Sequence, residues 1–189
     1  MAQIVSVMAL AHAPGVTGWL DAAPQDEQDK IVAGYQEMGR MLRAAKPDVI
    51  VGVANDHMLN LPLENPPDFC VGTAPNWHGP ADFFKDWLNQ PGYEVGGRPD
   101  VAEALTKAGK AAGLKLTSRE DLLFDDNWSV PLYYLDPDYS IPLVPIHMNC
   151  INPPVPTPEE SVKAGRVIAE SLKNDLPDDL RVAFIGTGG

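Results

Sequence analysis

The amino-acid sequence predicts an α/β fold built on a largely parallel sheet. Apolar, β-branched runs of strand length occur at residues 4–10 and 49–54, and residues 26–45 between them have helical periodicity. The same alternation returns near the end of the chain, where a helical segment precedes another β-branched run. Strands that alternate with helices are typical of α/β proteins. With 189 residues, 44% of them hydrophobic, the chain is long enough for one domain with a buried core.

The helix predicted over residues 26–45 is amphipathic. Ile31, Tyr35, Met38 and Leu42 recur at intervals of three or four residues, and they therefore lie on one face. Acidic residues at the start of this segment and basic residues near its end interact favourably with the helix dipole. Because one strand precedes the helix and another follows it, we predict a βαβ unit whose two strands are parallel and adjacent.

The second half of the chain contains further predicted elements. The strands are expected at residues 69–72, 141–146 and 181–185, and the helices at residues 82–88, 99–112 and 158–174. Prolines interrupt the strand at 141–146, which indicates an edge position or a distorted strand end. Thr157 as cap, Pro158 at the first helical position and two acidic residues after it form a favourable helix start.

Polar residues or glycines follow four of the predicted strands. His12 follows the first strand, and residues 55–57 (Asn, Asp, His) follow the second. Residues 147–149 and 186–189 follow the last two strands. If these strands are parallel, their carboxyl ends meet at one edge of the sheet, where open α/β folds bind their ligands. We therefore expect the four segments to surround one crevice.

Charge and cysteine content narrow the classes of partner. The formal net charge of −12 opposes binding to nucleic acids and to anionic membranes, because both are polyanions. Neither an apolar run of membrane-spanning length nor the basic segment that opens a signal peptide is visible, so we expect a cytoplasmic protein. Cys70 and Cys150 are far apart and belong to no metal-binding spacing, so both are expected to be reduced.

His12 and His57 are the candidate metal ligands. Both follow the carboxyl ends of predicted strands, and neutral imidazole is the commonest nitrogen ligand for metals. Taken singly, each is more often a hydrogen-bonded loop histidine, but their shared setting favours a metal site. Two histidines and a carboxylate are typical of non-haem Fe(II) oxygenases, although a zinc-dependent hydrolase uses similar ligands.

Other residues near these strand ends are weaker candidates. His147 is a candidate catalytic residue for proton transfer or substrate contact, with a structural role as the alternative. Asp126 lies in an acidic segment that either caps a turn or faces the site, and it is the second candidate catalytic residue. Trp128 and Asn149 are candidate substrate-binding residues, although a tryptophan is by default part of the core. His78 lies in a turn-rich segment and is expected on a surface loop.

At these residues the sequence resembles the class III extradiol ring-cleavage dioxygenases, the superfamily that includes the catalytic subunit of protocatechuate 4,5-dioxygenase. The resemblance extends over the whole chain. It is carried by Ala11-His12-Ala13-Pro14, Lys46-Pro47-Asp48 leading to Asn55-Asp56-His57, Phe69-Cys70-Val71-Gly72, Val130-Pro131-Leu132, Pro154-Val155-Pro156 and Gly186-Thr187-Gly188-Gly189. The ordered set is specific, whereas any single piece is not.

The resemblance implies a three-layer αβα fold with a central, largely parallel or mixed sheet. It also implies that Fe(II) is bound by His12, His57 and a downstream glutamate, and that O2 is used to open a catechol-like or aminophenol-like ring. The partners would be a small aromatic substrate and O2, with no nucleic acid and no membrane. Homo- or hetero-oligomer formation is left open by the sequence.

Two departures from the family pattern affect this expectation. Where the family has a histidine that takes part in acid-base chemistry or substrate binding, this chain has Asp126. The family's metal glutamate lies beyond the double glycine, so we expect it after Gly189 and expect the single catalytic domain at 1–189 to lack its C-terminal part. Within the chain, Asp56, Glu64 and Asp126 are the candidate carboxylate ligands. A non-catalytic or regulatory subunit with the same fold is the alternative from another functional class.

Overall fold

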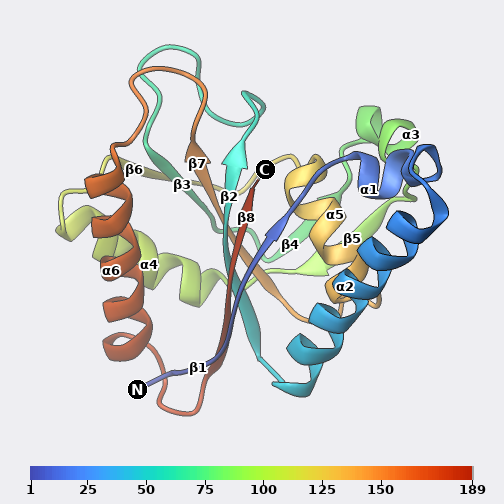
Figure 1. Ribbon diagram of the computed structural model, residues 1–189. Helices are drawn as coiled ribbons and strands as arrows, with labels where there is room; N and C mark the ends of the chain where they lie inside the picture. The colour runs from blue at the N-terminus through green and yellow to red at the C-terminus, as the bar shows by residue number, and fades with distance from the viewer. Residues whose placement is uncertain (189) are drawn as a thin grey trace.

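The computed structural model describes residues 1–188 and contains a mixed six-stranded sheet between two layers of helices (Figure 1). The strand order is β1-β8-β2-β7-β3-β6, and every pairing is parallel except that of β3 with β7. These strands are β1 (Gln3–Ala11), β2 (Val49–Asp56), β3 (Phe69–Gly72), β6 (Leu116–Arg119), β7 (Leu143–Asn149) and β8 (Arg181–Gly188). The expected α/β class and mixed sheet are therefore confirmed.

Helices cover both faces of the sheet. In Figure 1, α2 and α5 lie on one side, and α4 and α6 lie on the other. The helices are α1 (Gly15–Gly18), α2 (Gln25–Ala44), α3 (Lys85–Leu88), α4 (Pro99–Ala111), α5 (Asp126–Leu135) and α6 (Pro158–Asn174), with short 3-10 segments at Leu20–Ala22 and Asp82–Phe84. Thr157 caps α6, as predicted from the sequence, and the structure adds a reciprocal capping box with Glu160.

The predicted βαβ unit has parallel strands, but they are not adjacent. Strand β8 lies between β1 and β2 and pairs in parallel with both. The prediction of adjacency was therefore wrong, because a strand from the far end of the chain occupies the central position. The candidate site residues still lie together, because β1, β8, β2 and β7 are parallel and all end at the same edge of the sheet.

The proline-containing strand β7 is an interior strand and not an edge strand. Its pairing with β3 ends at Ile146, one residue after Pro145, so Pro145 is not required to donate a hydrogen bond to β3. On the other side, Pro145 lies opposite Gly52 of β2. The predicted edge position was therefore wrong, and the register of β7 with β2 is continuous from Leu143 to Asn149.

The short strand β6 and the short helix α1 were not predicted from the sequence. Two further segments also had no clear prediction. One is α5, which contains Pro131 and begins at the acidic segment around Asp126. The other is a hairpin of β4 (Asn76–Gly79) and β5 (Tyr93–Gly96), which forms a separate two-stranded sheet. Proline inside α5 and the short length of both hairpin strands explain why periodicity did not reveal them.

The two faces of β2 contribute to two separate parts of the core. Ile50 and Ala54 point to the α2 and α5 face, where Trp128 is among the buried residues. Val49 and Val51 point to the α4 and α6 face. This alternation follows from the two-residue repeat of a strand, and it explains why a strand covered on both faces is almost entirely apolar.

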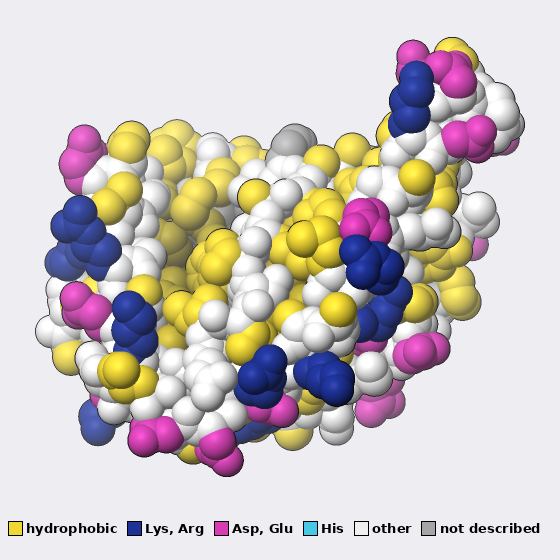
Figure 2. Space-filling model, turned by 60° about the horizontal axis from the view of Figure 1, so that its bottom comes forward, with side chains coloured by type: hydrophobic (Ala, Val, Ile, Leu, Met, Phe, Trp, Pro, Cys, Tyr) yellow, Lys and Arg dark blue, Asp and Glu magenta, His cyan; other side chains and the backbone are white. Residues whose placement is uncertain are grey.

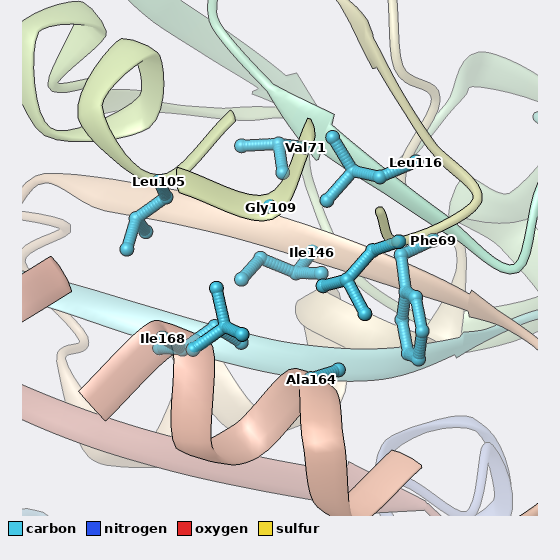
Figure 3. A pocket seen from close by; sticks show the side chains of 10 residues that line it. Phe69, Val71, Leu105, Gly109, Leu116, Ile146, Ala164 and Ile168 are labelled. Carbon is cyan, nitrogen blue, oxygen red and sulfur yellow. The ribbon is translucent and has the colours of Figure 1, made fainter. Parts of the chain in front are cut away.

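The α4 and α6 layer is closely packed against the sheet. A cavity between these helices and the sheet has a volume of only about 10 Å³, far below the roughly 300 Å³ at which small-molecule sites begin. Figure 3 shows that apolar side chains from α4, α6 and the neighbouring strands point into it. This apolar cavity is therefore too small for a substrate, and its lining residues contribute to the core.

The outer strand β1 and the surface around it are partly apolar. Val7 of β1 is 71% exposed and Ile4 is 39% exposed. Figure 2 shows hydrophobic side chains in the middle of one face of the molecule, with acidic and basic side chains around its borders.

None of the helices at residues 1–188 combines the length and the apolar composition required to cross a bilayer.

The contact between Gly52 and Trp128 gives a first testable prediction. A Cβ atom at Gly52 would lie 2.4 Å from the Trp128 ring, so Gly52→Ala should lower the free energy of unfolding by about 1–3 kcal/mol. Gly165→Ala in α6 is the matched control, because a Cβ there meets nothing within 4 Å. It should be neutral or stabilise by up to about 1 kcal/mol. Urea denaturation of both variants measures the difference, and equal effects would contradict this account of the core.

Candidate metal centre

Three potential ligands meet at the carboxyl edge of the sheet. His12 follows β1, His57 follows β2, and Asp126 is the first residue of α5. One ligand atom of each lies within 4.8 Å of the others. The two imidazole rings have centroids 5.1 Å apart and are nearly perpendicular, with an interplanar angle of 83°. The sequence predicted that the two histidines would meet, and the structure adds that Asp126 joins them.

Each histidine uses its Nδ1 atom to contact a neighbouring side chain. His12 Nδ1 lies 3.1 Å from the hydroxyl of Thr187, the β8 residue next to Gly188. His57 Nδ1 lies 3.0 Å from a carboxylate oxygen of Asp125 and 3.3 Å from one of Asp126. Metal-binding histidines commonly hold their second ring nitrogen in this way, which leaves Nε2 available for the metal.

The two imidazoles differ in their proton affinity. Burial lowers the pKa of His12 below 6.5, with the nearby Asp126 carboxylate acting in the opposite direction and the His57 ring adding to the decrease. The hydrogen bond to Asp125, followed by that to Asp126, raises the pKa of His57 to about 10. Without a metal, His57 is therefore protonated at neutral pH, and a metal ion that binds there replaces its proton.

Asp125 belongs to the acidic segment that was predicted from the sequence either to cap a turn or to face the site. One of its carboxylate oxygens accepts a hydrogen bond from the backbone N–H of Asn127, which caps α5, and the other faces His57. The Asn127 side chain donates to the carbonyl of Asn55 and so ties the start of α5 to the end of β2. The two alternatives considered for this acidic segment, capping and facing the site, both apply.

His147 does not present a free nitrogen to this cluster. It lies within β7, its side chain is fully buried, and both ring nitrogens have neighbours. Its Nε2 accepts a hydrogen bond of 3.0 Å from the Trp128 indole, and its Nδ1 lies 3.2 Å from Asp56. These contacts favour the structural alternative over proton transfer for His147.

The candidate substrate-binding residues Trp128 and Asn149 are also occupied by contacts within the protein. Trp128 is 1% exposed and packs in the core, so its ring is not a wall of an open site. Asn149 is buried, and its amide group donates to the carbonyls of Asn152 and Pro154 in the loop after β7. These contacts favour a core role for Trp128 and a loop-ordering role for Asn149. His78 is exposed beside Glu94, as expected, but it lies on strand β4 and not on the predicted loop.

Carboxylates other than Asp126 lie in different settings. Asp56 is buried beside His147, and Glu64 is exposed in the loop after β2. Gly189, the last residue of the predicted glycine loop, lies outside the described residues. Among residues 1–188, Asp126 is therefore the carboxylate that the fold brings to the two histidines.

The shifted pKa of His57 predicts a pH dependence of stability in the metal-free protein. Because the pKa rises from 6.5 to about 10 on folding, His57 stabilises the fold fully below about pH 6.5 and loses this effect as the pH rises to 10. The stability difference between wild type and His57→Gln should shrink over that range in denaturation experiments with a chelator present. His78→Gln is the control and should follow the wild type, and a constant difference for His57→Gln would contradict the assigned contacts.

Comparison with known proteins identifies relatives of the chain. It is 27% identical over 186 residues to a 2,3-dihydroxyphenylpropionate/2,3-dihydroxicinnamic acid 1,2-dioxygenase of Photorhabdus laumondii, a match that covers 98% of this chain and 55% of the relative. Enzymes with this description from Pseudomonas putida and Escherichia coli are each 27% identical, with 95% of this chain and 54% of the relative covered. The chain thus spans about half the length of these curated relatives.

A family model covers nearly the whole chain. The model described as the catalytic LigB subunit of aromatic ring-opening dioxygenase matches residues 6–189. This range includes His12, His57 and Asp126, as well as the strands that position them. The chain therefore belongs to the family of the catalytic LigB subunit of aromatic ring-opening dioxygenase.

Proposed function

We propose that this chain forms the metal-binding part of an Fe(II)-dependent extradiol dioxygenase that opens the ring of a catechol-like or aminophenol-like substrate with O2. The single observation that carries the proposal is the convergence of His12, His57 and Asp126 in a member of the ring-opening dioxygenase family. The names of the curated relatives support a catechol-type substrate. The expected cytoplasmic location remains a prediction.

The donor set fits Fe(II). Two imidazoles and one carboxylate are the ligands of non-haem iron oxygenases, and they leave further coordination positions open. His12 and His57 both have an outer hydrogen-bond partner on Nδ1, which fixes the orientation of each ring. Held by these residues, iron would bring a diol and O2 together, so that proximity replaces a direct encounter in solution.

The chain's own side chains have separate tasks in this proposal. Thr187 orients His12, and Asp125 orients His57. Asp126 supplies the carboxylate beside both rings, and a carboxylate in this place is able to accept a proton from a diol. Asp125 and Asp126 also place negative charge beside the two imidazoles, and this charge favours the binding of a divalent cation there.

Reconstitution with iron tests the activity directly. Protein loaded anaerobically with Fe(II) should consume O2 and give coloured ring-opened products with members of a panel of catechols and aminophenols. His57→Ala should abolish iron binding and lower the turnover rate by at least about 100-fold, because it removes a metal ligand and not only an outer contact. His78→Ala should retain both. Silence across the panel in an iron-loaded protein would exclude the proposed activity for this chain, and hydrolysis with retained zinc would favour a zinc enzyme.

A second variant separates the two roles of Asp126. If Asp126 is a ligand, Asp126→Ala should weaken Co(II) binding by more than about 10-fold, as followed by the visible absorption of the bound ion. Near-normal Co(II) affinity together with lost turnover would instead assign Asp126 to proton transfer, the other of the two roles that the sequence predicted for it. Glu64→Ala, an exposed carboxylate, is the matched control and should change neither quantity.

A further inference from the structure

A second histidine-carboxylate pair lies inside the sheet, below the metal centre. His147 lies in β7 near its carboxyl end, opposite Ala54 of β2 on one side and Cys70 of β3 on the other. Its side chain has no solvent exposure. A buried imidazole needs a partner for each nitrogen, and the identity of those partners decides where its proton lies.

The proton position follows from Trp128. The indole N–H of Trp128 lies 3.0 Å from His147 Nε2, and an indole nitrogen can only donate. His147 Nε2 must therefore accept, so the ring is uncharged and carries its hydrogen on Nδ1. A charged ring, or the other tautomer, would place two N–H groups against each other in a buried setting.

The Nδ1 hydrogen has one available acceptor. Asp56 Oδ1 and Asn60 Nδ2 both lie 3.2 Å from His147 Nδ1. The Asn60 amide is oriented by Leu123, whose N–H donates to Asn60 Oδ1 and whose carbonyl accepts from Asn60 Nδ2. Since the near atom of Asn60 is itself a donor, the hydrogen of His147 points to the Asp56 carboxylate.

Asp56 in turn holds the segment that carries His57. Its carboxylate accepts hydrogen bonds from the backbone N–H groups of Asn60, at 3.1 Å, and Leu61, at 3.3 Å. Asp56 and Leu61 thus close a short turn, and His57 is the first residue inside it. Met58 in this turn has a φ of 63°, an uncommon conformation that requires support from such contacts.

We propose that His147, locked as the uncharged Nδ1–H tautomer by Trp128, is a positioning residue that fixes the turn bearing His57 through Asp56. His147 acts on the metal centre only through Asp56 and the backbone of residues 56–61. The inference rests on the proposed function insofar as His57 binds the metal, but the tautomer and the turn are properties of the metal-free protein.

Nitrogen NMR tests the first step in the wild type, with no variant that has to fold. In protein with ¹⁵N-labelled histidine at neutral pH, His147 should show a protonated Nδ1 and an unprotonated Nε2, assigned by comparison with His147→Gln. A protonated Nε2, or a doubly protonated ring, would overturn the proposal.

Metal affinity tests the second step. His147→Phe keeps an aromatic ring but removes both hydrogen bonds, and it should weaken Co(II) binding by about 10-fold, the lower end of the effect of losing a direct partner of a metal ligand, because it acts on His57 through Asp56. His147→Gln retains one donor and one acceptor, and it should restore Co(II) affinity to within about threefold of the wild type.

Trp77→Phe is the control for a merely structural effect. The buried Trp77 indole donates to the carbonyl of Leu143, also in β7, so its loss should lower the melting temperature without changing Co(II) affinity. Equal losses in His147→Phe and His147→Gln, or a loss of similar size in Trp77→Phe, would overturn the proposal.

The position of His57 provides a readout that does not depend on metal binding. In the metal-free protein, the ring resonances of His57 should shift in His147→Phe and stay in place in Trp77→Phe. If the wild type bound no metal, the proposed function would be wrong. The His57 resonances of the metal-free protein would still decide whether His147 positions His57. Unshifted His57 resonances in folded His147→Phe would overturn it.

Discussion

The site depends on the parallel alignment of β1, β8, β2 and β7. Parallel strands bring all their carboxyl ends to one edge, so residues far apart in the chain become neighbours there. His12 after β1 contacts Thr187 of β8, although 175 positions separate them. His57 reaches the same edge from β2. A different strand order with the same directions would keep the histidines at this edge, but it would separate His12 from the hydroxyl that orients it.

Helix α5 supplies the negative charge of the site. Its N-cap, Asp125, uses one oxygen to begin the helix and the other to hold His57, and the next residue brings Asp126 to the two rings. A helix N-terminus stabilises such carboxylates, so capping and ligand orientation reinforce each other. Because Trp128 of α5 also packs over Gly52 and donates to His147, the same helix connects the metal centre to the core.

The two histidine-carboxylate pairs show how surroundings decide the role of a residue. His57 is half-buried, has carboxylates near Nδ1 and keeps Nε2 free for a ligand. His147 is fully buried, and the Trp128 indole occupies its Nε2. Both lie at or near strand ends, so sequence position alone could not distinguish them. What differs is the partner of the second ring nitrogen, and that partner comes from a distant helix.

Local patterns in the sequence determined most elements and half of the site. Apolar runs and helical spacing predicted β1, α2, β2 and α6, and the βαβ logic predicted that His12 and His57 would meet, because short-range periodicity records which faces are buried. Only the tertiary structure decided that β8 separates β1 from β2, that β7 is interior, and that Asp125 and Asp126 complete the site. These features depend on pairings between segments far apart in the chain, where the free energy comes from burial and hydrogen bonds that local composition does not specify.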